Sequence, residues 1–298
     1  MNWLFPALLS PAVYAVVNFV DKYLIEDKVK DYRGMPIYGG IVGLLFGTLV
    51  YFVSGTHLLD SYNAAIILLT GVLTIWGYYF YFQALSRTET SYIISLFQMT
   101  PIMTLVFSYL LIGERISTVQ YAGFILILFA VFFLSFKREK RLLTFNSTFV
   151  SILLTDIFFA ISLVLIKFAS FNYSLTTIVV YESWGYALGG LVLFIAFPWV
   201  RNSFLTTVRS TGISVLGIFV INECLFVLAK ALGFWAVTLG PVSLVSVLSG
   251  TQVFYGVIFG VLLTLIAPHI FKEEISIRTL KRKVIASTIL FIGIWCVS

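Results

Sequence analysis

Long apolar runs, separated by short polar stretches, extend along almost the whole chain. Of the 298 residues, 60% are hydrophobic and 11% are charged, and the mean hydropathy is +1.03. A helix needs roughly 20 apolar residues to cross a bilayer core about 30 Å thick. The runs predict an all-α membrane protein with ten transmembrane helices, and they leave no segment for a water-soluble domain. The expected spans are residues 3–20, 35–54, 64–84, 91–112, 117–136, 147–169, 175–198, 210–232, 237–266 and 284–298.

Basic residues are distributed unevenly over the connections between these spans. Of the 19 Lys and Arg residues, 16 fall in every second connection, beginning with the first. Because Lys and Arg in short loops are enriched on the cytoplasmic side, we expect the basic runs 137–141 and 281–283 to face the cytoplasm. Both termini are then outside an inner or plasma membrane. Such runs orient a chain more often than they bind nucleic acid, so no nucleic-acid partner is expected.

The two halves of the chain resemble each other weakly but in order. Residues 8–23 match 153–168 at an offset of 145, and residues 83–85 match 230–232 at an offset of 147. The offset grows in one direction, as small insertions in a tandem copy would produce. Because each half holds five spans, an odd number, the second copy enters the membrane in the opposite orientation. We predict two inverted five-helix repeats, residues 1–141 and 142–298.

Glycines recur at four-residue spacing in corresponding spans. The second span holds Gly39, Gly43 and Gly47, and the seventh holds Gly185 and Gly189. Such spacing lets helix backbones approach closely. The glycines serve either static packing or the sliding of one half against the other, and they also allow two copies to pair as a homodimer.

Several short motifs occur in a fixed order along the chain. They are Gln83-Ala84-Leu85, Ser91, Pro101, Gly113-Glu114-Arg115-Ile116-Ser117, Gly240-Pro241-Val242-Ser243-Leu244, Gln252 and Glu273-Glu274. In this order the chain resembles the EamA-like proteins of the drug/metabolite transporter superfamily. The resemblance implies a secondary carrier with a central cavity lined by spans 1, 3, 4, 6, 8 and 9. Members of the superfamily carry very different small solutes, so the likeness does not select a substrate.

Charged residues within the second-half spans are the first candidates for a binding or coupling site. A charge at the bilayer centre costs about 2.5–3.5 kcal/mol on insertion scales, so it usually faces a cavity or a partner. Glu223 and Lys230, seven residues apart on roughly the same helix face, form either an ion-pair network or part of a site. Glu182 is either a proton-coupling carboxylate or a structural partner, for example of Lys167. Asp156 is the remaining charged candidate.

Neutral residues extend this candidate set. Trp76 is the repeat counterpart of Glu223, and aromatic rings opposite a carboxylate would suit a cationic or amphipathic solute. Hydrogen bonding between helices is the alternative role for the polar members, and contact with lipid is the alternative for the rings. The neutral candidates are Asn222, Trp76, Ser95, Gln98, Ser246, Ser249 and Gln252.

These features favour a secondary active transporter of a small metabolite or drug-like solute, working by alternating access with or without proton coupling. The alternative is a lipid head-group flippase-like or scaffold membrane protein. An enzyme is not expected, because the carboxylates are spread over several spans without a clustered nucleophile. His57 and His269 lie apart, and Cys224 and Cys296 are expected to be buried small hydrophobic residues, so no metal or cofactor is predicted. The expected partners are the solute and membrane lipid.

Overall fold

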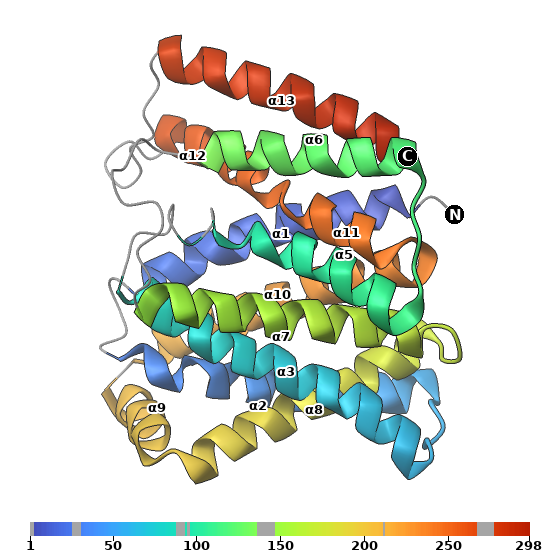
Figure 1. Cartoon of the computed structure of the whole chain (residues 1–298). Coiled ribbons are helices and arrows are strands. Elements are labelled where there is room, and N and C mark those ends of the chain that lie inside the picture. The colour runs from blue at the N-terminus through green and yellow to red at the C-terminus, as the bar shows by residue number, and fades with distance from the viewer. Residues whose placement is uncertain are drawn as a thin grey trace.

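The computed structural model describes residues 3–25, 31–87, 93, 96–135, 147–210, 212–266 and 277–298, and all the regular secondary structure in them is helical. Helix α1 begins and α13 ends at the same end of the bundle, here called the terminal end, and α9 lies at the opposite end (Figure 1). The first half contains α1 (Leu4–Tyr23), the 3-10 helix η2 (Tyr32–Gly34), α2 (Met35–Ser54), α3 (Ser61–Leu85), α5 (Met99–Ile112) and α6 (Thr118–Ser135). The second half contains α7 (Ser147–Ala169), α8 (Leu175–Ala196), α9 (Pro198–Ser210), α10 (Ile213–Leu239), α11 (Val242–Ser249), α12 (Gln252–Ile266) and α13 (Ile277–Val297).

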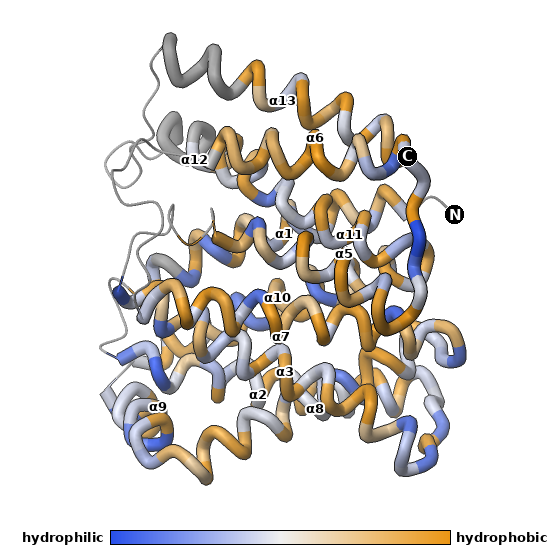
Figure 2. Tube along the Cα trace, viewed as in Figure 1, coloured by the Kyte–Doolittle hydropathy of each residue, from blue (hydrophilic) through white to orange (hydrophobic). Residues whose placement is uncertain are grey.

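The helices have the length and composition of membrane spans. Within the described ranges, seven helical segments are long and apolar enough to cross a bilayer, and α5, α6 and α13 contain shorter apolar helices. Apolar colour covers most of the long helices, while polar colour gathers in α9 and in connections at the two ends (Figure 2). Large apolar side chains such as Phe52 and Trp295, 75% and 79% exposed, point outward. Lipid is the environment in which such a surface is stable, so the chain is a multi-pass membrane protein.

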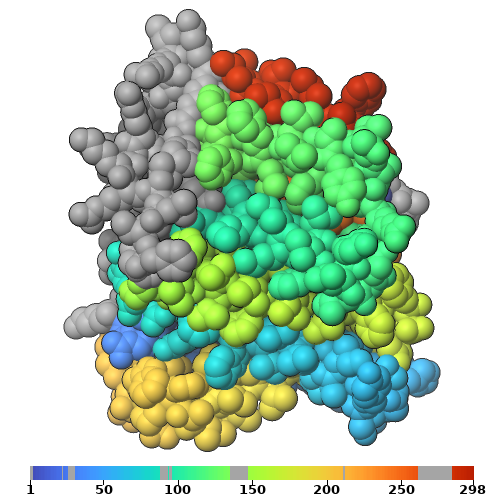
Figure 3. Space-filling view, viewed as in Figure 1, coloured from blue at the N-terminus to red at the C-terminus, as the bar shows by residue number. Residues whose placement is uncertain are grey.

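Helices from the two halves are interleaved. Helix α2 packs against α8, α3 against α7 and α8, α1 against α10, and α6 against α13. On the face shown in Figure 3, segments of early and late sequence alternate across the surface. The closest helix contacts in the described residues therefore lie between the two halves of the chain.

The structure corrects several expected boundaries. The connection after α8 holds an additional helix, α9, and α10 continues to Leu239. The expected span 237–266 is two helices, because α10 ends at Gly240 and a second break falls at Gly250 and Thr251. A Cβ on Gly250 would lie 2.9 Å from Gln98 Oε1, so the glycine at this break allows the Gln98 side chain to approach closely.

The last helix also differs from the expectation. Helix α13 begins at Ile277, so residues 281–283 belong to its first turns and not to a loop. In the fourth expected span, the continuous helix α5 begins at Met99. Ser95, the basic run 137–141 and the pair Glu273-Glu274 lie outside the described residues.

Helix α9 is amphipathic and too polar to cross a membrane. Pro198 occupies its first position, where a missing N–H has no cost. Val200, Ser203 and Thr207 are buried against the protein, whereas Arg201 and Arg209 are exposed. This arrangement is typical of a helix that lies along the membrane surface.

Candidate functional site

Helix α10 presents its polar residues to the interior of the bundle. Asn222, Phe226 and Lys230 are buried at four-residue intervals, which places them on one face, and Glu223 is partly buried beside them. Ile221 is 63% exposed on the outer side of the helix. Cys224 is also exposed, contrary to the expectation that it is buried.

Lys230 and Glu182 form a buried ion pair between α10 and α8. The Lys230 Nζ lies 2.6 Å from Glu182 Oε2, and their side chains are 5% and 0% exposed. This contact lacks hydrogen-bond geometry, and neither atom, nor Glu182 Oε1, has a hydrogen-bond partner among the described residues. The contact shows that Glu182 is paired with Lys230 and not with Lys167. A buried ion pair without additional hydrogen bonds adds little stability compared with an apolar pair.

Three aromatic rings surround the Lys230 ammonium. Its Nζ lies 4.5 Å from the ring centroid of Tyr186, 5.6 Å from that of Phe226 and 6.0 Å from that of Phe234. A ring face attracts a cation electrostatically at such distances, most strongly where water is excluded. One carboxylate and three ring faces thus hold the ammonium.

Two further carboxylates lie beside this pair. Asn222 Nδ2 donates a 2.7 Å hydrogen bond to Asp21 Oδ1, which joins α10 to the end of α1. Glu223 interacts electrostatically with Asp21 and Lys230. Gly39 on α2 leaves room for Glu223, since a Cβ there would be 3.0 Å from Glu223 Oε2. Sequence reasoning missed Asp21 because it follows the end of the expected first span and resembles a loop residue.

Aromatic residues from four helices form one wall of the cluster. The ring centroid of Tyr78 on α3 is 4.9 Å from that of Phe226 and 6.5 Å from that of Tyr186. Tyr14 on α1 approaches Phe226 at 5.7 Å. Trp76, the residue singled out from the sequence, instead packs against Phe197 at 5.9 Å. We call Tyr14, Asp21, Tyr78, Glu182, Tyr186, Asn222, Glu223, Phe226 and Lys230 the central cluster.

Two other sequence candidates, Asp156 and Ser246, belong to a second polar group around α5. Asp156 Oδ1 on α7 accepts a 2.5 Å hydrogen bond from Thr100, and Ser246 on α11 donates to Thr104 at 3.1 Å. Ser249 donates to the carbonyl of Ser246 at 2.6 Å. These contacts include hydrogen bonds between helices, the alternative role expected for such residues. Gln98 is buried beside Gly250, and Gln252 is partly buried.

Two charged side chains fasten the turn between α10 and α11. Glu114, in the α5–α6 connection at the terminal end (Figure 1), accepts hydrogen bonds from the amides of Val242 and Ser243 at 2.8 and 3.0 Å. Lys167 Nζ donates to the carbonyls of Val237 and Gly240, each at 2.9 Å. The acid thus caps a helix start and the base a helix end, as the backbone dipoles favour. The Glu114 contacts join the two halves at the terminal end, whereas the Lys167 contacts lie within the second half.

We expect Glu114→Ala to destabilise the protein, because it leaves two amides at the start of α11 without their acceptor. Hydrogen bonds to charged groups contribute about 1.5–3 kcal/mol each, so the loss of two should lower the free energy of unfolding by about 3–6 kcal/mol. Thermal unfolding in detergent measures the change. Arg115→Ala, at the exposed neighbouring position, is the matched control. Equal melting of the two variants would contradict the capping role.

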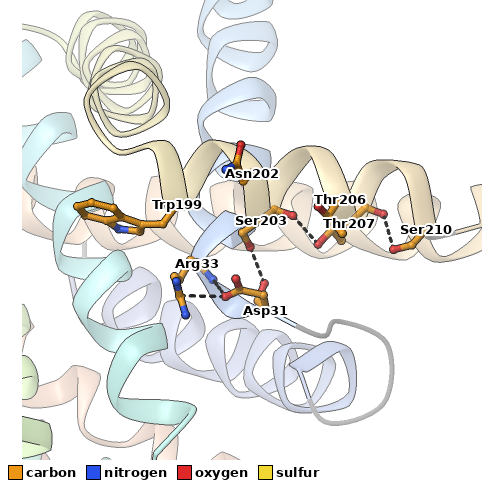
Figure 4. Close-up of a pocket in the computed structure, with 8 residues that line it drawn as sticks. All are labelled: Asp31, Arg33, Trp199, Asn202, Ser203, Thr206, Thr207 and Ser210. Carbon is orange, nitrogen blue, oxygen red and sulfur yellow. Dashed lines mark hydrogen bonds and ion pairs between the residues drawn. The ribbon is translucent and has the colours of Figure 1, made fainter.

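A shallow pocket lies at the opposite end of the bundle, between η2 and α9 (Figure 4). It has a volume of about 340 Å³, and Ser203 is one of its lining residues. The Ser203 hydroxyl accepts from the Gly34 amide and donates to the Asp31 carbonyl, both at 3.0 Å, while Arg33 pairs with Asp31 at 3.3 Å. Because these groups satisfy one another, the contacts anchor α9. The lining residues are Asp31, Arg33, Trp199, Asn202, Ser203, Thr206, Thr207 and Ser210.

Comparison with known proteins relates part of this chain to a protein family. Residues 1–136 match the model of the EamA-like transporter family. Over these residues the chain is similar to the EamA-like transporter family. The match agrees with the resemblance to the drug/metabolite transporter superfamily inferred from the motifs, and this family is described as one of transporters.

The fold of almost the whole chain is similar to that of a solved structure. A solved crystal structure, described only as that of a protein, covers 99% of this chain and 96% of its own at a TM-score of 0.65. The identity is 14%, so this likeness concerns the fold alone. Matches to solved structures number 28 chains, and a search of curated proteins gives no match.

Proposed function

We propose that this EamA-like protein is a secondary active transporter that carries a small solute by alternating access through the central cluster. The observation that carries the proposal is the buried Glu182–Lys230 pair, which has two further carboxylates beside it and lies between helices of an apolar bundle. Charged residues at membrane depth are costly and typically mark solute or ion pathways. Their position between helices is where transporters with repeated halves bind their substrates.

The packing supports two inverted repeats, residues 1–141 and 142–298. The sequence offset pairs α1 with α7, α2 with α8, α3 with α10, and α6 with α13. Helices α2 and α8 pack on each other, as do α6 and α13, so each meets its own counterpart. The contact of α3 with α7 corresponds to that of α10 with α1. This is the pattern of a two-fold relation between the halves.

One pair of helix contacts breaks the relation. Helices α3 and α8 pack closely, whereas the corresponding pair, α10 and α2, has few contacts. A Cβ on Gly71 of α3 would overlap the carbonyl oxygen of Glu182, yet one on Gly217 of α10 would meet nothing within 4 Å. Gly217 follows Gly71 by the same 146 residues that separate Gly185 from Gly39. Alternating access would exchange these two arrangements, closing α10 on α2 while α3 and α8 separate.

The same asymmetry indicates which end is closed. The tight α3–α8 contact and the Glu114 and Lys167 caps belong to the terminal end, whereas Gly217 lies near the start of α10, just after α9 (Figure 1). The uneven distribution of Lys and Arg favours termini outside a cell membrane. The conformation seen in the structure would then be closed toward the outside of the cell.

Glu223 is the proposed proton carrier. It is only partly buried and has no ion-pair partner among the described residues, unlike Glu182. We expect Glu223→Gln to remove the dependence of transport on a pH gradient while leaving the protein folded, because the amide cannot exchange a proton. Cys224→Ala, on the outer side of the same turn, is the matched control.

The experiment begins with a thermal-shift screen of amino acids, sugars, nucleosides and amines on purified protein, since a bound solute stabilises the fold. Each stabilising compound is then tested for uptake into proteoliposomes with and without an imposed pH gradient. We expect uptake that responds to the gradient in wild type and not in Glu223→Gln. A response that survives in both Glu223→Gln and Glu182→Gln would contradict proton coupling, and absence of uptake for every stabilising compound would contradict transport.

A further inference from the structure

We infer that the central cluster binds an organic cation, whose ammonium head takes the place that Lys230 Nζ now occupies between Glu182 and the surrounding rings. This inference rests on the proposed transport function and names the class of solute. In this interpretation, Lys230 is a tethered cation that holds the site in the absence of solute. A free amine replaces it during each cycle.

The balance of charge in the cluster favours a positive occupant. Among the side chains that the structure describes there, Asp21, Glu182 and Glu223 are acidic, and Lys230 is basic. An excess of buried carboxylates is costly unless protons or cations compensate it. An anionic solute would increase this imbalance, whereas an ammonium group would reduce it.

The shape of the ammonium site supports the same class. The rings of Tyr186, Phe226 and Phe234 face the Lys230 Nζ at 4.5–6.0 Å, and Glu182 supplies one close carboxylate oxygen. Aromatic faces with a carboxylate are the groups by which proteins recognise alkylated ammonium ions. Tyr14 and Tyr78 extend this wall beyond Phe226, which gives an apolar substituent of the cation a surface to contact.

The Lys230 ammonium is held in a way that permits exchange. Its contacts are one ion pair and three ring faces, and no hydrogen bond from it to a described residue fixes its direction. A lysine side chain has a flexible four-carbon stem, so its ammonium group can move while the backbone of α10 stays in place. The incoming ammonium then leaves Glu182 paired, and no carboxylate is stranded.

The test measures binding of benzyltrimethylammonium to purified protein by calorimetry. We expect Lys230→Met to bind this probe at least about tenfold more tightly than wild type, because the competing ammonium is gone. Benzyl alcohol and phenylacetate, its neutral and anionic counterparts, should show no such gain. In the double variant Glu182→Gln with Lys230→Met, the gain should disappear.

Unchanged affinity of Lys230→Met for the cation, or an equal gain for benzyl alcohol, would overturn the inference. A second comparison, Phe226→Leu, keeps both charges and removes one ring face. It should weaken cation binding severalfold relative to wild type even if Lys230→Met cannot be purified, and unchanged binding would also count against the inference.

The two proposals fail in different ways. Glu182-dependent uptake of only neutral or anionic compounds into proteoliposomes would overturn the cation class and leave transport intact. Tight cation binding by Lys230→Met, with no uptake of any stabilising compound by wild type, would support the cation site and contradict transport.

Discussion

Replacing Glu182 by Gln is expected to abolish solute uptake and to destabilise the protein, because it leaves the Lys230 ammonium buried without its carboxylate. Breaking a buried ion pair on one side costs about 3–5 kcal/mol. The side chains of this pair are 0% and 5% exposed, so water cannot compensate the remaining charge. Thermal unfolding in detergent should show a large decrease in melting temperature, and proteoliposomes should show no gradient-driven uptake.

The double variant Glu182→Gln with Lys230→Met separates stability from function. Removing both charges leaves no buried charge at this position, so most of the lost stability should return. Uptake should remain absent, since the groups that we assign to the solute are gone. Recovery of both stability and uptake in the double variant would show that the pair is a structural link without a role in transport.

Substitution of Gly71 should have the largest effect on the conformational equilibrium. A Cβ at this position overlaps backbone atoms of Glu182 and Tyr186 on α8, which cannot move aside as a flexible side chain could. Gly71→Ala should therefore separate α3 from α8 and favour the state in which α10 closes on α2. We expect uptake to fall at least about tenfold, corresponding to an equilibrium shift of about 1.4 kcal/mol.

Gly217→Ala is the opposite comparison. Gly217 is exposed and has open space around it, so a methyl group there leaves the state seen in the structure unchanged, although it would hinder the closing of α10 on α2. Spin labels at Ile41 of α2 and Ile213 of α10, in a protein lacking Cys224 and Cys296, report the distance between these helices. Both positions are exposed. The distance should shorten in Gly71→Ala and stay unchanged in Gly217→Ala. Equal distances in the two variants would argue against an exchange of helix contacts.

Apolar runs determine that most segments of this chain are helices in a membrane, since each unpaired backbone group in lipid costs several kcal/mol. The expected span 147–169 coincides with α7, and 35–54 coincides with α2. The expected helix boundaries are wrong where a polar helix lies between two spans or where a glycine ends a helix. Helix α9 was missed because its five polar or charged outward residues resemble a loop, although Pro198 marks its start.

The sequence alone also indicates that ionisable residues at membrane depth are unusual, which singles out Glu182, Glu223 and Lys230. Only the tertiary structure decided which of them meet. The partner of Glu182 is 48 residues away on another helix, and Asp21 reaches Asn222 across 201 positions. The hydropathy of the sequence indicates which segments lie in lipid. It carries no information on how helices from the two halves cross, and that crossing is fixed by close packing at residues such as Gly71 and Gly185.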